Sequence, residues 1–442
     1  MTEETKSNAG QKLALSFNPA KRLMSFLEPT VWHHMTPMAQ KYNALNLGQG
    51  FPGFTPPDFV KQALADATLE KNGLNYLANQ YARSAGNLML VNKLAEIYTP
   101  RLRRTIDPQT EVIICNGATG VIFNATQSLL NPGDEVVAFE PTFDIYLAQS
   151  EMCGATLKPV PLVLEENAET KTPEWTFDME AFRSQFNERT RLLILNTPHN
   201  PTGKVFTRAE LEAIAAVVRE FPNVVVIADE VYEHLVYEGE HIHFASLPDM
   251  YERTLTVSSA GKTFSCTGWK IGWAIGPKHL IQGLGIAGSW VSFSVNTPSQ
   301  IAIANALTQA EKPTFGPKQD ETYFKWLRDS YLTKRQILCD GLREAGFKPI
   351  QPQGSFFVMA DSSDIEIPQK CFDQWPGESR DWVLARWLTS EMGVACIPPS
   401  PFYCEKNKPL AYNLLRFAFA QSDDILRQAV GRLKQLRAFV RK

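Results

Sequence analysis

The chain has 442 residues, of which 44% are hydrophobic and 21% charged, and its formal net charge is −3. This length exceeds what one ordinary hydrophobic core holds, so two or more packed units are expected. The near-neutral charge gives no reason to expect nucleic acid or an anionic membrane as a partner, and no apolar run approaches the roughly 20 residues that span a bilayer.

The N-terminal residues and the cysteines point to one compartment. Residues 1–12 are polar and include Glu3 and Glu4. They lack the apolar stretch of a secretory signal, and the acidic pair argues against a mitochondrial presequence, so we interpret them as a short disordered tail. The seven cysteines form no C-x-x-C pair, which suggests neither a disulfide framework nor a zinc site. We therefore predict a cytoplasmic protein with reduced thiols and no metal.

Apolar runs alternate with helical patterns through the middle of the chain. Strands are predicted at 111–115, 135–139, 192–196, 224–228, 254–258 and 270–275, and helices at 117–130 and 208–219. Continuous apolar strands separated by helices indicate a mostly parallel sheet covered on both faces. The C-terminal third, with helices near 319–345, 381–392 and 423–440 and strands at 355–360 and 415–420, fits a smaller α+β unit. Residues 371–379 are predicted to form a surface loop.

The first strand-to-helix junction contains the small residues Asn116-Gly117-Ala118-Thr119-Gly120. Small residues at a helix N-terminus expose backbone N–H groups, which suit a phosphate. The turn matches neither the dinucleotide-binding pattern nor the P-loop, so by itself it is weak evidence.

A second turn, Asn196-Thr197-Pro198-His199-Asn200-Pro201-Thr202-Gly203, follows the strand predicted at 192–196. Its prolines make the turn rigid, so that Asn200 is presented with little freedom left to lose. As a turn alone it is weak evidence. It becomes a candidate part of the cofactor site because it lies between strands that each end in a candidate cofactor-binding group.

A carboxylate comes directly after the next strand, in Asp229-Glu230-Val231-Tyr232. Ligands of open α/β sheets bind beyond the carboxyl ends of the strands, where Asp229 is expected. Its carboxylate could hold a proton on a pyridine nitrogen, and Tyr232 could donate to a phenolic oxygen on the same ring. The alternative is an aspartate that caps a following helix.

Lys262 lies among small residues in Ser258-Ser259-Ala260-Gly261-Lys262, shortly after another strand. A desolvated lysine amine can attack a carbonyl to form an imine. A Schiff-base lysine together with an aspartate partner for the pyridinium nitrogen is the recurring requirement of pyridoxal 5′-phosphate (PLP) sites. The alternative for Lys262 alone is an ordinary lysine in a flexible glycine loop.

Taken together, these elements resemble the class I aminotransferases of fold type I, and most of all the group of kynurenine aminotransferases, glutamine transaminase K and cysteine-S-conjugate β-lyases. The phrases that carry the resemblance are 46–52, 196–203, 229–232, 259–264 with 267–270, and 415–417. It implies an α/β fold in which a large PLP-binding domain has a mostly parallel seven-stranded sheet sandwiched by helices, next to a smaller α+β domain. The implied boundaries are 1–60 for the tail and an arm of the small domain, 61–310 for the large domain and 311–442 for the small domain.

The resemblance also implies a role for each matching residue at the cofactor. Lys262 would hold PLP as a Schiff base and move the proton, Asp229 would pair with the pyridinium nitrogen, and Tyr232 and Asn200 would bond the phenolic oxygen. Phe143 would stack on the ring. The residues implied at the phosphate are Ala118 and Thr119 through their backbone, Ser259, Lys270 and, from the partner of a homodimer, Tyr81.

Arg416 would bind the substrate α-carboxylate, since guanidinium suits a carboxylate and this arginine lies in the apolar run 414–419. A buried charge needs a partner, which argues against a surface arginine. The remaining substrate-side residues implied are Gly50, Asn200, Trp32 and, from the partner, Phe293. For Trp32 a place in the core is the alternative.

The predicted reaction is a ping-pong transfer of the amino group of an aromatic or sulfur-containing L-amino acid, with kynurenine, Phe, Trp, Met and Gln as candidates, to a 2-oxo acid. The group commonly has tyrosine at the position of Thr119, which leaves the substrate preference open. Cysteine-S-conjugate β-lyase activity at the same site is the nearest alternative. A ligand-sensing transcription regulator would need about a hundred residues of DNA-binding region ahead of this domain, and fewer than fifty precede Gly48. A PLP-binding protein without activity is disfavoured by the full residue set.

Overall fold

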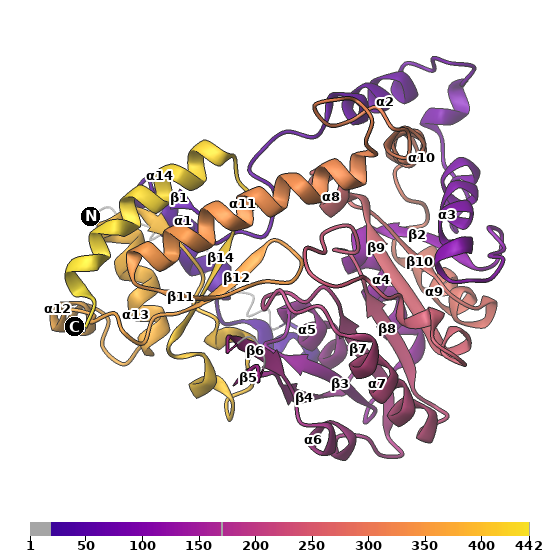
Figure 1. Cartoon of the computed structure of the whole chain (residues 1–442). Coiled ribbons are helices and arrows are strands. Elements are labelled where there is room, and N and C mark those ends of the chain that lie inside the picture. The colour runs from indigo at the N-terminus through magenta and orange to yellow at the C-terminus, as the bar shows by residue number, and fades with distance from the viewer. Residues whose placement is uncertain (1–18, 169–170, 442) are drawn as a thin grey trace, which may run out of the picture.

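The computed structural model describes residues 19–168 and 171–441, so the tail predicted at 1–12 lies outside the described residues. Its centre is a seven-stranded sheet in the order β2-β10-β9-β8-β7-β3-β4 (Figure 1). The strands are β2 (Val112–Asn116), β3 (Glu135–Glu140), β4 (Thr156–Pro161), β7 (Thr190–Asn196), β8 (Val225–Asp229), β9 (Thr254–Ser259) and β10 (Ile271–Ile275). Only β10 runs antiparallel to its neighbours in this sheet. The predicted α/β fold with a mostly parallel seven-stranded sheet is confirmed.

Helices cover both faces of this sheet, because successive residues of a strand point to opposite sides. In β3, Val136 and Ala138 pack in a core with helices α4 (Gly117–Leu129), α5 (Asp144–Met152) and α9 (Lys278–Val291). Val137 and Phe139 pack on the other side, with α6 (Met179–Ser184) and α7 (Arg208–Glu220). The other helices of this unit are α2 (Asp58–Thr68), α3 (Leu88–Arg101), α8 (Ala260–Thr263) and α10 (Thr297–Ala310).

Strand β4 has no counterpart among the strands predicted from the apolar runs. It lies at one edge of the sheet, where most of its residues are only partly buried, and it contains Pro159 and Pro161. An edge strand tolerates proline because one side of its backbone needs no ladder hydrogen bonds. Its sequence therefore lacks the continuous apolar run of the central strands. A separate hairpin follows it, formed by β5 (Val163–Glu166) and β6 (Pro173–Thr176).

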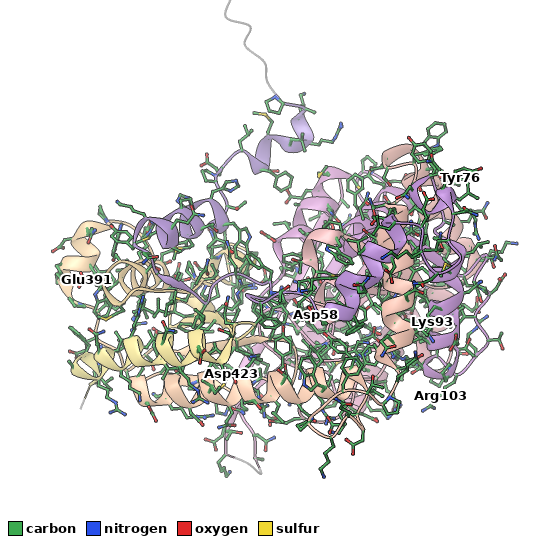
Figure 2. The ribbon with its side chains drawn as sticks, turned by 90° about the horizontal axis from the view of Figure 1, so that it is seen from above. Asp58, Tyr76, Lys93, Arg103, Glu391 and Asp423 are labelled. Atoms are coloured by element: carbon green, nitrogen blue, oxygen red, sulfur yellow. The ribbon has the colours of Figure 1, made fainter. Side chains whose placement is uncertain are left out.

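The C-terminal part forms a second, smaller sheet, antiparallel and in the order β11-β12-β14. Its elements are α11 (Tyr323–Ala345), β11 (Lys348–Ile350), β12 (Phe357–Asp361), α12 (Gln369–Gln374), α13 (Arg380–Trp387), β13 (Val394–Ala395), β14 (Leu414–Ala418) and α14 (Asp423–Leu433). Helix α14 lies along α11, as Figure 2 shows, and Lys334 Nζ and Asp423 Oδ1 are 2.5 Å apart there.

The N-terminal segment packs on this smaller unit. Helix α1 (Val31–Lys41) precedes β1 (Leu45–Asn46), which pairs in parallel with β13. The two ends of the described chain therefore contribute to one part of the molecule, although the boundaries 1–60, 61–310 and 311–442 stay a prediction. None of the described helices has the length and apolar character needed to cross a membrane.

The prediction of a surface loop at 371–379 is wrong for its first half. Residues up to Gln374 belong to α12, and Cys371 is buried in the main core. Proline at the N-terminal end is compatible with a helix start, so Pro368 does not prevent this short helix. Most residues of the segment are polar, so its composition does not indicate that the Cys371 side chain is buried.

Candidate active site

A cavity of about 570 Å³ opens at the carboxyl ends of β7, β8 and β9. Parallel strands end at the same edge of a sheet, which is where ligands of such folds bind. Twelve of the fourteen residues predicted for the site line this cavity: Trp32, Gly50, Ala118, Thr119, Phe143, Asn200, Asp229, Tyr232, Ser259, Lys262, Lys270 and Arg416. Tyr81 and Phe293 do not.

Lys262 lies on the single turn of α8, which begins directly after β9. The turn is capped by the Ser259 side chain, whose Oγ accepts a hydrogen bond from the Gly261 N–H at 3.1 Å. The Lys262 Nζ donates to the Gly50 carbonyl at 2.7 Å. Burial lowers the pKa of the Lys262 amine to about 8, with the charge of Asp229 opposing. More of this amine is therefore neutral, and nucleophilic, near neutral pH than in an ordinary lysine.

Asp229 is the last residue of β8 and is buried. Its Oδ2 accepts a hydrogen bond from the Tyr146 hydroxyl at 2.6 Å, and its Oδ1 accepts from the Val231 N–H at 3.4 Å. Burial raises the pKa of Asp229 to about 6, against the hydrogen bonds and the charge of Lys262. No helix begins at Asp229, since the described residues that follow it form a turn, so it does not serve as a helix cap.

Tyr146 is a site residue that the sequence analysis missed. It lies on α5, lines the cavity and is buried. A signal was available, because Tyr146 follows the predicted stacking residue Phe143 by three positions. Residues three apart share one face of a helix or of its first turn.

Two asparagines connect β7 to the site. The Asn196 side chain donates to the Asp229 carbonyl at 2.8 Å and accepts from the Asn200 N–H at 2.7 Å. These bonds hold the turn that carries Asn200 against the end of β8. Tyr232, also at the cavity, is buried, and burial raises the pKa of its phenol above the ordinary value, so it stays a hydrogen-bond donor.

One end of the cavity is suited to an anion. Helix α4 begins at Gly117, which has φ +71°, and Ala118 and Thr119 follow in its first turn. A Cβ on Gly117 would lie 3.1 Å from the Lys270 Nζ, so this ammonium lies against the start of the helix. A Cβ on Gly272 of β10 would lie 2.4 Å from the Ala118 nitrogen. The close packing of two backbones thus leaves a helix N-terminus and a lysine at one place, a favourable site for phosphate.

Arg416 lies in the middle of β14 with 2% of its surface exposed. It donates to the Gly48 carbonyl at 2.6 Å and to the Asn200 Oδ1 at 3.3 Å. Its Nε has no hydrogen-bond partner among the described residues, and none of their carboxylates lies within ion-pair distance, although the charge of Asp144 acts on it. Burial lowers the pKa of Arg416 to about 10, so the group is still charged near neutral pH. A buried cation without a carboxylate calls for an external anion.

Aromatic rings surround this guanidinium. Its carbon lies 4.5 Å from the ring centre of Phe357, 5.1 Å from that of Trp32 and 5.3 Å from that of Phe402. The Trp32 indole N–H also donates to the Asp144 carboxylate at 3.0 Å. Trp32 therefore lies at the cavity and also packs against the core, and its role at the substrate stays a prediction.

Tyr81 and Phe293 lie apart from the cavity and contact each other, with ring centres 5.1 Å apart. They are 83% and 60% exposed in the single chain. Their predicted role in the site of a partner subunit stays a prediction.

Comparison with known proteins shows the family of the chain. The family model "Aminotransferase class I and II" matches residues 42–433. The chain belongs to this family. The aminotransferase is 43% identical to a kynurenine–oxoglutarate transaminase of Dictyostelium discoideum, over 96% of this chain and 98% of the relative. Human kynurenine–oxoglutarate transaminase 1 is 36% identical, over 94% of this chain and 97% of that protein.

Solved structures place the aminotransferase in the same family. A Saccharomyces cerevisiae protein described as a candidate kynurenine aminotransferase superposes with a TM-score of 0.88 at 34% identity, covering 96% of this chain and all of that one. An Escherichia coli protein with a methionine aminotransferase function gives 0.81 at 31% identity, covering 95% of this chain and all of that one. The protein is thus a transaminase with the fold type I architecture.

Proposed function

We propose that this aminotransferase uses PLP, bound in the cavity between α4 and Lys262, to transfer the amino group of an aromatic or sulfur-containing L-amino acid to a 2-oxo acid. The observation that carries the proposal is the buried, unpaired Arg416 in the same cavity as Lys262 and Asp229. It supplies a place for an α-carboxylate beside an amine and a carboxylate suited to the cofactor.

The cavity fits PLP on three counts. The N-terminus of α4, with Lys270 and Ser259, suits the phosphate. The Asp229 carboxylate suits the pyridine nitrogen, and Lys262 lies close enough to both Asp229 and Arg416 for their charges to change its pKa. The volume of about 570 Å³ is within the range of small-molecule sites and leaves room for a substrate beside the cofactor.

When bound, PLP supplies a protonated ring that withdraws electrons from the substrate Cα and so weakens its C–H bond. Asp229 would keep the proton on the ring nitrogen, and Tyr146 holds the Asp229 carboxylate in place. Lys262 would hold the cofactor, and its amine would be the base that takes the proton from the substrate Cα. Arg416 orients the substrate through its α-carboxylate, and the same residues act in reverse on the incoming 2-oxo acid.

Aromatic and sulfur-containing side chains are the proposed donors because aromatic residues line the substrate side. Trp32 and Phe357 both border the cavity, and both lie beside Arg416. The names of the relatives, kynurenine–oxoglutarate transaminase and methionine aminotransferase, support the same class of donor.

A half-reaction screen tests the proposal. Holoenzyme is mixed with single L-amino acids without a 2-oxo acid, and loss of the visible absorbance of the bound cofactor ranks the donors. We expect kynurenine, Phe, Trp, Met and Gln to react faster than aspartate; a preference for aspartate would overturn the donor class. Lys262→Ala should abolish that absorbance, whereas Lys278→Ala, at the exposed start of α9, should not. Release of pyruvate and ammonia from a cysteine S-conjugate without an added oxo acid would instead favour the lyase.

We further propose that the active unit is a cytoplasmic homodimer. Tyr81 and Phe293 contact each other and are exposed, and Trp290 and Tyr76 are further exposed aromatic side chains, at 89% and 65%. Tyr76 lies at the outer edge of the molecule in Figure 2. Exposed apolar groups of this extent favour a protein interface. The seven cysteines are all free, which supports a reducing compartment. Analytical ultracentrifugation should give twice the mass of one chain, and Trp290→Glu should lower the measured mass toward that of one chain.

A further inference from the structure

A second group of ionisable side chains lies next to Asp229 but outside the cavity lining. Glu230 is fully buried, and its Oε2 lies 3.1 Å from the His241 Nε2 and in hydrogen-bond contact with the His243 Nδ1. Its other oxygen accepts a hydrogen bond from the Phe244 N–H at 3.1 Å. One carboxylate oxygen thus faces two imidazole nitrogens.

The backbone explains why both histidines reach this carboxylate. Residues 241–243 form no helix or strand and lead into the short turn Phe244–Ser246, and His243 has an extended conformation. In extended chain, residues two apart point to the same side. Ile242, between them, points into the apolar core that contains α7.

The three side chains have the composition and spacing of a metal site. The His241 Nε2, His243 Nδ1 and Glu230 Oε2 are suitable ligand atoms, and one ligand atom of each residue lies within 4.8 Å of the others. Zn²⁺ binds imidazole nitrogen and carboxylate oxygen at about 2.0–2.2 Å, so the ligand atoms of a tetrahedral ion lie roughly 3.4 Å apart. The Glu230–His241 distance of 3.1 Å is already close to that spacing, whereas Glu230 and His243 would have to exchange their direct hydrogen bond for the ion.

The surroundings add features typical of a metal centre. The outer nitrogen of His243 faces the Glu233 carboxylate at 3.8 Å. Histidines that bind metals commonly direct their second nitrogen at a carboxylate. Glu233 is itself held by the Tyr98 hydroxyl at 2.6 Å and by Arg101 at 2.6 Å. The Nδ1 of His241 is buried and has no hydrogen-bond partner among the described residues. The His241 ring therefore uses only its Nε2 in a hydrogen bond.

We propose that Glu230, His241 and His243 bind a divalent transition-metal ion of the Zn²⁺ type, with water in the fourth position. Two histidines and one carboxylate are an established ligand set for such ions. The side chains of His241 and His243 are 9% and 10% exposed, and His241 directly follows the exposed residues 238–240, so the cluster lies just beneath the surface. The ion connects the segment before Phe244 to the end of β8, and so stabilises the strand end that carries Asp229. Cysteine spacing, on which we based the expectation of no metal, carries no information about this His-x-His pair.

Zinc binding by the PLP-loaded protein tests the proposal without recourse to catalysis. The protein is treated with a chelator, dialysed without amino acids and titrated with Zn²⁺ by calorimetry, and bound zinc is counted by elemental mass spectrometry. We expect one zinc ion per chain, a higher Tm with zinc and unchanged cofactor absorbance, because a ligand that binds only the folded state stabilises it. Less than half an ion per chain at saturation, or zinc that changes the cofactor absorbance in proportion to binding, would overturn the proposal.

Variants identify the ligands. His243→Gln and His241→Gln should each weaken zinc binding at least tenfold, and His279→Gln, which alters an exposed histidine on α9, should leave it unchanged. Equal binding by wild type and His243→Gln would contradict the assignment. If a ligand variant fails to fold, Co²⁺ bound to the wild-type protein decides: intense visible bands beyond those of the cofactor indicate a four-coordinate site with nitrogen ligands, and their absence counts against it.

Discussion

The Tyr146 hydroxyl donates a hydrogen bond to the Asp229 Oδ2 at 2.6 Å, although 83 residues separate the two in the chain. Both side chains are buried, and burial with the neighbouring Asp229 charge raises the pKa of Tyr146 well above its ordinary value. Tyr146 therefore stays protonated, and so a hydrogen-bond donor, near neutral pH. The bond ties α5 to the end of β8 and fixes the direction of the carboxylate that the proposed mechanism uses.

Tyr146→Phe should lower kcat by roughly ten- to a hundredfold with a smaller effect on KM, because a hydrogen bond to a charged group contributes about 1.5–3 kcal/mol. The ring stays in place, so packing is preserved. Steady-state kinetics with a good amino donor check this, and Tyr42→Phe, at an exposed residue after α1, is the control. An unchanged kcat in Tyr146→Phe would show that the Val231 N–H alone positions Asp229.

The reaction of Lys262 with added PLP should have its midpoint near pH 8, below the ordinary lysine value of 10.5. Only the neutral amine attacks the aldehyde, so the rate of reconstitution of the apoenzyme should rise with pH and level off above the pKa of Lys262. Stopped-flow absorbance measures it.

The charge of Asp229 raises the pKa of Lys262, so its removal should lower that pKa further. Asp229→Asn should therefore move the midpoint of reconstitution to lower pH. A wild-type rate that still rises through pH 10 would contradict the lowered pKa.

Arg416→Ala should raise KM for amino-acid donors by roughly a hundredfold, since loss of one partner of a buried hydrogen-bonded charge pair costs about 2–5 kcal/mol. Arg416→Lys should recover little of this, because an ammonium lacks the planar fork of guanidinium. A primary amine that lacks a carboxylate should react only slowly with the holoenzyme, and both variants should leave this rate unchanged. Arg427→Gln, on the exposed side of α14, is the control. A KM for amino acids that Arg416→Ala leaves unchanged excludes the carboxylate role.

Gly272→Ala should destabilise the protein by about 2–3 kcal/mol and weaken cofactor binding. The new Cβ would lie 2.3 Å from the Gly117 carbonyl carbon, and backbone cannot move aside as a flexible side chain can. Urea unfolding and PLP titration check the two effects. Gly268→Ala is a matched control, because nothing lies within 4 Å of its Cβ position. Equal stability of the two variants would mean that the start of α4 is more adaptable than its close packing indicates.

The sequence by itself determined the central strands and the residues at their ends. Hydrophobic runs and the turns after them are local properties, so Asn200, Asp229 and Lys262 could be assigned to strand ends without any knowledge of the fold. Their common location followed because parallel strands end at one edge of a sheet. The edge strand β4 was not predicted, because a half-exposed strand with prolines lacks a continuous apolar run.

Tertiary structure alone decided which distant residues complete the site. Arg416 donates to the Gly48 carbonyl across 368 residues, Tyr146 reaches Asp229 from another helix, and His241 and His243 meet at Glu230. The antiparallel insertion of β10 between β2 and β9 brings Gly272 against the start of α4. Each of these contacts depends on how the whole chain packs around its hydrophobic cores. The periodicity of a segment indicates its secondary structure and its buried face, but it does not determine which distant segment packs against that face.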